Sequence, residues 1–456
     1  MNLSQLYRSR LGRNIVSNYL GMFWLAALSL IAVPIYVHLL GRTGWAIVAA
    51  SMAIQMFLSF LDAGFGQVMP RWLAQASDSL FEQAKLYRIF SGAFIALGLT
   101  GFLLGQAFAG TLARTWFNTG QIPPGELELG IRIVLFQFLF QFGNSANIGY
   151  WNGIQLQTLA NVRQCLFMTL KHAAATLSIV FIARSPMCYL ISFAALGATE
   201  FLVNRLTVVR RLGNELVRAR QIDRDEIKRV VIQAGSFSVA VLVGTLVSQL
   251  DRIVLSNTQD LVSFGTYAIV ASLGLSFMQF AAPVGRAFLP RLALDFSRNT
   301  GDLHRTTFRL FLTLLLVCVL PCLAVGTFAP LVLKLWIHNA TIVADGTFPL
   351  RLLLVAVVLN AIYNLFYGHM IISGNGAVPV AINIACLVAS LLAVAFVGTH
   401  IGIALGGVIW IASTSTQLVL GATWYFLFYS RGPSLGVDGL RLVRQAISAI
   451  FRGTTR

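Results

Sequence analysis

Apolar runs of about 20 residues recur along the whole chain, and short polar links separate them. About 20 consecutive apolar residues in a helix are enough to cross the hydrocarbon core of a bilayer. Apolar side chains make up 57% of the sequence and charged ones only 11%, whereas soluble domains carry about 25% charged residues. A soluble globule of this size could not cover its surface with so few polar groups. The sequence therefore predicts an all-α integral membrane protein.

The apolar runs predict twelve membrane-spanning helices, near residues 16–40, 45–62, 87–109, 129–150, 162–183, 187–209, 230–256, 263–288, 308–333, 350–372, 379–399 and 403–429. The basic residues test this topology, because cytoplasmic loops of membrane proteins carry an excess of Lys and Arg. With the N-terminus in the cytoplasm, 25 of the 33 basic residues fall on the inner face and six on the outer face. The remaining two, Lys171 and Arg252, lie within spans. We therefore expect both termini to be cytoplasmic.

A repeat with a period near 220 residues divides the twelve spans into two halves of six. GWAIVAAS (44–51) aligns with TYAIVASL (266–273), and Pro70-Arg71 aligns with Pro290-Arg291. Chance matching of apolar helices is the alternative. Because six is an even number, both copies enter the membrane from the same side, which predicts two bundles related by a pseudo-two-fold axis along the membrane normal.

The expected domain boundaries follow from this repeat and from the basic segments. The prediction is an N-terminal six-helix bundle at 1–209, a basic cytoplasmic linker at 210–229, a C-terminal six-helix bundle at 230–430 and a basic cytoplasmic tail at 431–456. The tail has an apolar helical face, which suits an amphipathic helix on the inner leaflet. Ordinary inside-positive charge without a further role is the alternative.

Two sequence motifs are similar to those of a known transporter family. LDAGFG (61–66) at the end of the second span, and DRIVL (251–255) with FGTYAIV (264–270) in the seventh and eighth spans, resemble the Wzx-type oligosaccharide flippases. These proteins belong to the multidrug/oligosaccharidyl-lipid/polysaccharide exporter superfamily. The family positions that carry over to this sequence are Asp62, Asp251 and the region of Tyr267.

The resemblance implies two six-helix bundles that work by alternating access. It implies movement of an undecaprenyl-pyrophosphate-linked oligosaccharide from the inner to the outer leaflet of the bacterial cytoplasmic membrane. The product would serve O-antigen, capsule or exopolysaccharide assembly. The implied partners are the lipid-linked oligosaccharide, membrane lipids, a polysaccharide polymerase and chain-length regulator proteins.

Ionisable residues inside spans are candidates for functional sites, because a charge at the bilayer centre costs about 2.5–3.5 kcal/mol or more. Lys171, beside His172 in the fifth span, is interpreted as a cationic contact for the pyrophosphate or an acidic sugar. A lysine paired with an interior carboxylate for structure is the alternative. On the first interpretation, Lys171 favours an anionic substrate over a cationic drug.

The fourth span carries a polar stripe that would be costly against lipid. Gln137, Gln141 and Asn144 lie at i, i+4 and i+7, and their amides suit sugar hydroxyls. The stripe predicts cavity lining, with hydrogen bonding between helices as the alternative. Arg252 in the seventh span is a further candidate for the cavity.

Two acidic residues are candidates for ion coupling. Glu200 in the sixth span could carry a proton, and the alternative is a salt bridge with Arg205. Asp251 is the second candidate. It cannot simply pair with Arg252, because adjacent helical residues point about 100° apart.

The repeated ends of the second and eighth spans predict a gate at the inner mouth. Asp62, Arg71 and Arg291 are the candidate residues, and Pro70 and Pro290 are expected to end or bend their helices. Topology alone would also place both arginines there.

Two other functions remain as alternatives. A cation-coupled multidrug exporter of the same superfamily would share the fold. A membrane polysaccharide polymerase or ligase is less favoured, because such proteins typically carry a substantial outer loop with catalytic Arg and His. No phosphate-binding glycine loop occurs, and the basic residues are spread over several loops, which argues against nucleic acid. We expect no catalytic residue, metal site or cofactor.

Overall fold

The computed structural model describes residues 10–62, 65–219, 224–297, 302–374, 376–398 and 400–429. Within these ranges the regular structure is helical, apart from one isolated bridge between Asn118 and Asp260. The fold class predicted from the apolar runs, an all-α membrane protein, is confirmed.

The helices follow one another with short connections. They are α2 (Arg10–Leu58), α3 (Phe65–Gln75), α4 (Leu80–Thr111), α5 (Pro124–Gly153), α6 (Gln157–Phe181), α7 (Pro186–Arg218), α8 (Arg224–Thr258), α9 (Leu261–Ser276), α10 (Met278–Ser297), α11 (Asp302–Leu314), α12 (Leu320–Thr327), α13 (Ala329–Ile337), α14 (Ala340–Ile372), α15 (Ala377–Val397) and α16 (Ala404–Trp424). Short 3-10 or π turns extend four of them: η1 (Ser59–Asp62), η2 (Leu112–Trp116), η3 (Leu315–Val319) and η4 (Tyr425–Tyr429).

Nine helical segments of the described chain are long and apolar enough to cross a membrane. One of them, Val16–Asp62, contains both of the first two predicted spans. Gly41 divides it with a φ of 69°, a conformation that residues with a Cβ rarely adopt. The predicted fourth and seventh spans form α5 and α8, which are not among the nine. The count of twelve therefore stays a prediction.

The apolar surface of the helices is typical of a protein that faces lipid. Phe181 and Ile182 at the end of α6 are 80% and 78% exposed, and Phe396 in α15 is 84% exposed. In water such residues would favour burial, whereas lipid tails accept them without cost. The chain is a multi-pass membrane protein.

The described residues form two compact units. Unit 1 comprises the described residues within 1–273, 328–350 and 397–406, and unit 2 those within 274–327, 351–396 and 407–456. These units do not coincide with the two predicted six-helix halves, since unit 1 takes up segments of the second half. The division of the chain into two halves at 210–229 stays a prediction.

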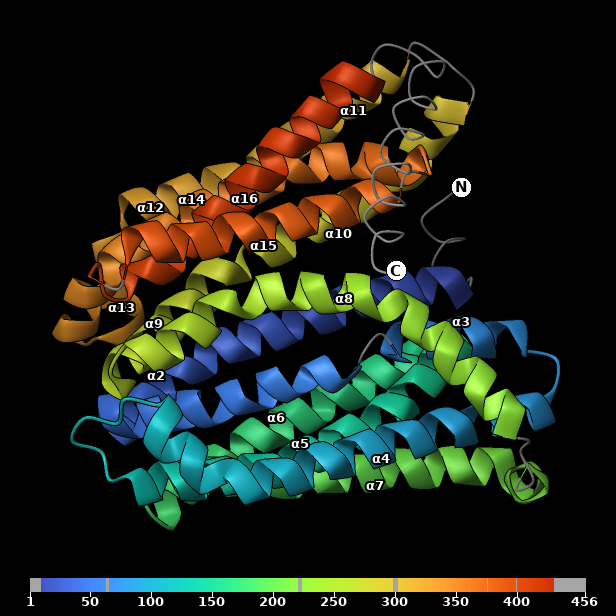
Figure 1. Ribbon diagram of the computed structural model, residues 1–456, viewed down its shortest axis with the longest axis horizontal. Coiled ribbons are helices and arrows are strands. Elements are labelled where there is room, and N and C mark those ends of the chain that lie inside the picture. The colour runs from blue at the N-terminus through green and yellow to red at the C-terminus, as the bar shows by residue number, and fades with distance from the viewer. Residues whose placement is uncertain are drawn as a thin grey trace, which may run out of the picture. The chain divides into compact units, whose positions relative to one another are not determined.

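Unit 1 is built on helices that lie side by side (Figure 1), with α5 packed against both α4 and α7, and α6 against both α2 and α7. Two apolar clusters fill the space between these helices. One contains Met69, Phe90 and Tyr150, and the other contains Tyr36, Val134 and Leu190. This packing fixes the positions of the polar side chains described below.

The expected linker at 210–229 is mostly helical. Residues 210–218 belong to α7, which has a non-helical Gly213, and residues 224–229 belong to α8. The tail at 431–456 lies outside the described residues.

Each of the two repeated segments contains a break, at the end of the predicted second span and in the middle of the predicted eighth span. A 3-10 turn at Ser59–Asp62 separates α2 from α3, and Phe277 separates α9 from α10. Pro70 and Pro290 were expected to end or bend their helices, and because they lie inside α3 and α10 they do not end them. The breaks come earlier in the sequence, before each proline.

Candidate functional site

A buried ion pair joins the middle of α6 to the middle of α7. The Lys171 Nζ lies 2.6 Å from Glu200 Oε2, and both side chains are 10% exposed or less. The second Glu200 oxygen, Oε1, accepts a hydrogen bond of 3.2 Å from Asn144 Nδ2 on α5. A buried ion pair needs such additional bonds to offset its desolvation.

The ion pair continues into a chain of hydrogen bonds through the inside of unit 1. Asn144 Oδ1 accepts from Asn147 at 3.2 Å and from Asn204 at 3.1 Å. Arg163 donates to Asn204 Oδ1 at 3.1 Å, and the Tyr87 hydroxyl donates to Asn147 Oδ1 at 2.6 Å. Satisfied polar networks of this kind hold neighbouring helices in one arrangement.

The geometry answers two questions that the sequence left open. Lys171 pairs with an interior carboxylate, which is the structural alternative to a substrate contact. The alternative pairing of Glu200 with Arg205 is wrong, because the Arg205 Nη1 donates to the Ser91 hydroxyl at 2.7 Å instead. His172 turns away from Lys171, and its Nδ1 lies 3.0 Å from the Tyr36 hydroxyl within an aromatic cluster.

The polar stripe of the fourth span separates into two environments. Gln137 and Asn144 are 4% and 3% exposed, and they lie among packed helices. Only Gln141 is exposed and lines a cavity. The expectation that the three amides line one cavity together is therefore wrong, since α5 buries two of them against its neighbours.

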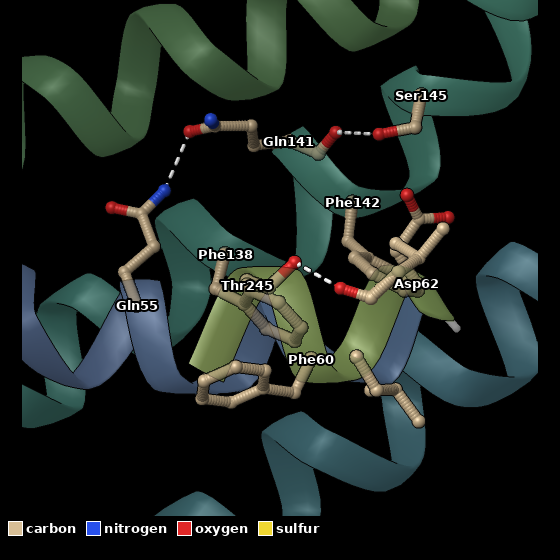
Figure 2. Close-up of a pocket in the computed structure, with 10 residues that line it drawn as sticks. Gln55, Phe60, Asp62, Phe138, Gln141, Phe142, Ser145 and Thr245 are labelled. Atoms are coloured by element: carbon tan, nitrogen blue, oxygen red, sulfur yellow. Dashed lines mark hydrogen bonds between the residues drawn. The ribbon is translucent and has the colours of Figure 1, made fainter. Parts of the chain in front are cut away.

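The cavity lies in unit 1 between the end of α2, α5 and α8, and has a volume of about 300 Å³ (Figure 2). Its polar lining is Gln55, Asp62, Gln141, Ser145 and Thr245, and its apolar lining is Phe60, Phe138, Phe142, Val241 and Leu242. The Gln55 Nε2 donates to Gln141 Oε1 across it. Apolar walls with a few directed polar groups are typical of ligand sites.

Asp62 is held in this cavity by the start of α3. Its Oδ1 accepts a hydrogen bond of 2.9 Å from the Gly66 backbone N–H. A Cβ at position 66 would lie 2.9 Å from Asp62 Oδ2, so the glycine lets the carboxylate lie against the first turn. This contact explains the spacing of Asp62 and Gly66 in the LDAGFG motif.

Asp251 and Arg252 point to different partners, as their adjacent positions on a helix predict. Asp251 is 1% exposed, and its Oδ2 accepts a hydrogen bond of 2.5 Å from the Tyr267 hydroxyl. Its Oδ1 is buried without a hydrogen-bond partner among the described residues. Arg252 donates to Gln249 Oε1 at 3.1 Å, and it does not line the cavity.

The three residues expected at an inner-mouth gate lie in different surroundings. Asp62 and Arg71 belong to unit 1, where Arg71 is exposed. Arg291 belongs to unit 2, where it pairs with Asp295 at 3.0 Å. Their role as a gate stays a prediction.

Segments from the two sequence halves meet inside unit 1. A Cβ on Gly265 of α9 would lie 2.8 Å from the Ala46 Cα of α2, so the two helices cross with almost no space between them. Beside this crossing, the Arg42 Nη2 lies 3.2 Å from Asp345 Oδ2 and 3.2 Å from the Thr266 hydroxyl. The predicted topology places this crossing on the outer side of the membrane.

Among the described residues, no group of three or more His, Cys, Asp or Glu side chains is arranged to hold a metal ion.

Solved structures with the same fold are transporters. An inward-facing multidrug resistance MATE family transporter of the MOP superfamily is 17% identical, with a TM-score of 0.66 over 94% of this chain and 96% of that chain. The MATE multidrug transporter DinF-BH is 14% identical, with a TM-score of 0.64 over 94% and 97% of the two chains. A MOP superfamily transporter from Pyrococcus furiosus Vc1 is 17% identical, with a TM-score of 0.56 over 93% and 97%. At these identities the likeness shows the fold.

The sequence itself matches a family model over most of its length. Curated proteins give no significant match, but the model of the family described as "Polysaccharide biosynthesis protein" matches residues 11–294. This match and the MOP superfamily fold confirm the resemblance noted in the sequence. The chain belongs to the polysaccharide biosynthesis protein family.

Proposed function

We propose that this protein is a flippase that moves an undecaprenyl-pyrophosphate-linked oligosaccharide from the inner to the outer leaflet of the bacterial cytoplasmic membrane. The observation that carries the proposal is the cavity in unit 1, in which amides, hydroxyls and a carboxylate stand beside phenylalanine rings. Amides both donate and accept hydrogen bonds, as sugar hydroxyls do. Membership of the polysaccharide biosynthesis protein family supports a glycan as the cargo.

The buried ion pair alters one argument about the substrate. Lys171 favoured an anionic substrate only if its charge was free, and Glu200 neutralises it at 2.6 Å. None of the described residues lining the cavity is basic. The case for a glycan substrate therefore rests on the amides, hydroxyls and carboxylate of the lining and on the family, and not on Lys171 and His172.

Flipping in a purified system tests the proposal. Vesicles that contain the protein and a fluorescent polyprenyl-pyrophosphate-linked oligosaccharide are expected to expose the glycan to an external lectin faster than vesicles without protein. The spontaneous rate is low because a sugar must leave water to cross the hydrocarbon core. Equal exposure in both kinds of vesicle, with correctly inserted protein, contradicts the proposal.

A cation-coupled multidrug exporter is the second candidate. Asp62 beside Phe138 and Phe142 is an arrangement that also suits a lipophilic cation, because aromatic faces attract cations. The same vesicles separate the two functions. Uptake of a lipophilic dye cation without any glycan exposure would support the exporter.

Transport by alternating access in the inner membrane, with both termini in the cytoplasm, completes the proposal. The basic inner loops support this orientation, and the tight crossing of α2 and α9 supports a state that is closed on the outer side. A downstream polysaccharide polymerase and chain-length regulators are the proposed partners. The protein is proposed to act as a transporter and not as an enzyme.

Asp251 is the better supported of the two residues proposed for ion coupling. Its ionised form would be buried with only the neutral Tyr267 hydroxyl as partner among the described residues, and binding a proton or another cation removes that cost. Glu200 already has a cationic partner, and protonating it would leave the Lys171 ammonium buried without a counter-charge.

Asp251→Asn is expected to remove the acceleration of flipping by a proton gradient, because the amide cannot bind and release a proton. The basal rate without a gradient is expected to change less. Flipping rates in vesicles with and without an imposed pH difference measure the effect. A variant that still responds fully to the gradient would show that the coupling site lies elsewhere.

A further inference from the structure

The cavity between α2, α5 and α8 is too small for a whole lipid-linked oligosaccharide. Its volume of about 300 Å³ lies at the lower end of the range of about 300–1,000 Å³ found for ligand pockets. A site of this size holds one part of such a substrate, either a sugar or the pyrophosphate.

The charge of the lining decides between these two parts. Asp62 is the only charged residue among the described residues that line the cavity. A phosphate or a uronic acid placed beside this carboxylate would meet a like charge without a compensating cation. Burying an unpaired anion is costly, so the pyrophosphate is excluded and an uncharged or cationic group is favoured.

The free hydrogen-bonding groups of the cavity match a sugar ring. Asp62 uses Oδ1 to accept from Gly66 at 2.9 Å, and no described donor reaches Oδ2. The Gln55–Gln141 bond uses one donor and one acceptor, which leaves Gln55 Oε1 as an acceptor and Gln141 Nε2 as a donor. Hydroxyls can satisfy all three groups, because each hydroxyl both donates and accepts.

The aromatic side of the cavity suits the C–H faces of the same ring. The Phe138 and Phe142 rings lie 5.1 Å apart between centroids and are tilted by 35°. Both line the cavity together with Gln55 and Gln141 (Figure 2). A pyranose has apolar C–H faces and polar edges, so it can contact the aromatic rings and the polar groups at once.

We propose that this cavity is a subsite for a single neutral or amino sugar of the transported glycan, and that Asp62 selects against acidic sugars. The inference rests on the proposed flippase function and names the sugar class that one site accepts. Asp62 is a specificity-determining residue in this scheme, and its Oδ2 accepts from a hydroxyl or from the ammonium group of an amino sugar.

Binding of simple glycosides to the full-length protein in lipid nanodiscs tests the subsite. Saturation-transfer NMR is expected to show binding of methyl glucoside and methyl glucosaminide to the wild type, and at least about tenfold weaker binding of methyl glucuronide. Asp62→Asn is expected to remove this discrimination, bringing glucuronide to within about threefold of glucoside. Asparagine also accepts from a helix N-terminus, so the variant keeps the contact with Gly66.

Two further variants make the result specific. Gln141→Ala alters an exposed residue and is expected to weaken all three glycosides without changing their order. Glu215→Gln removes a carboxylate that pairs with Arg218 outside the cavity, and it is expected to leave binding unchanged. If Asp62→Asn fails to fold, the subsite is still tested by the order of the three glycoside affinities in the wild type and by the weaker binding expected for Gln141→Ala.

Wild-type binding of glucuronide as tight as glucoside, or no binding of any glycoside, would overturn the subsite. Flipping of the lipid-linked oligosaccharide is measured separately in vesicles. Flipping without glycoside binding would overturn the subsite alone, whereas failure to flip would overturn the proposed function.

Discussion

Glu200→Gln alone is expected to destabilise the protein by about 3–5 kcal/mol, because it leaves the Lys171 ammonium buried without a counter-charge. Lys171→Met is expected to destabilise the protein by a similar amount, because it leaves the Glu200 carboxylate buried without a counter-charge. Thermal unfolding in detergent, together with the yield of inserted protein, measures both losses.

The double variant Lys171→Met with Glu200→Gln is expected to recover most of this stability. It removes both charges and keeps an oxygen that can accept from Asn144. Replacing a buried ion pair as a whole is often neutral, whereas breaking it is costly. Glu215→Gln is the matched control, because its pair with the exposed Arg218 contributes little.

The double variant also separates structure from transport. Loss of export in a Lys171 single variant would follow from instability alone and would not show a substrate contact. A stable double variant that flips at the wild-type rate would show that neither residue binds substrate or carries a proton. If Glu200→Gln is as stable as the wild type, the ion pair is not structural.

Gly265→Ala is expected to lower the flipping rate at least about tenfold. Destabilising the outer-closed state by only about 1.4 kcal/mol is enough for a change of this size. The added Cβ would lie 2.8 Å from Ala46 Cα and 2.9 Å from Ala46 Cβ. A flexible side chain could move out of the way of the added Cβ, but the backbone of Ala46 cannot. The variant therefore requires α2 and α9 to separate.

Labelling from outside the cell reports this separation directly. Thr266 is 2% exposed, so a cysteine placed there, after replacement of the five free cysteines, is expected to resist an impermeant maleimide. With Gly265→Ala the introduced thiol is expected to react. Gly92→Ala in α4 is the control, since nothing lies within 4 Å of its Cβ position. Normal flipping in Gly265→Ala, together with an introduced thiol that stays unreactive, would contradict the assignment of this crossing as an outer closure.

The membrane helices were predictable because apolar length is a strong local signal, whereas contacts between helices depend on register. Lys171 and Glu200 were each identified as buried charges, but they were given separate roles. Their pairing could have been predicted from the antiparallel hairpin that α6 and α7 form. Arg163 and Asn204, which bond, lie at equal distances from its turn at 182–185, and Lys171 and Glu200 lie within about one helical turn of equal distances from it.

Other parts of the site had no such signal. Which amides of the fourth-span stripe are buried depends on which face of α5 the neighbouring helices cover. The helical period of 3.6 residues shows that the amides share a face, but it does not show which part of that face is covered. Tyr87 joins the network from α4 through Asn147, and nothing in its sequence surroundings marks it. Asp62 was recognised through its motif, but its contact with Gly66 requires the 3-10 turn that precedes α3.

The pairing of Lys171 with Glu200 also has an electrical consequence. The transmembrane potential does work only on net charge that moves through it, at about 2.3 kcal/mol per elementary charge and 100 mV. An ammonium and a carboxylate held 2.6 Å apart move together as a dipole of zero net charge when their helices tilt. Voltage therefore does little work on this pair, and any voltage dependence of the transport cycle must come from the cargo or from charges elsewhere in the chain.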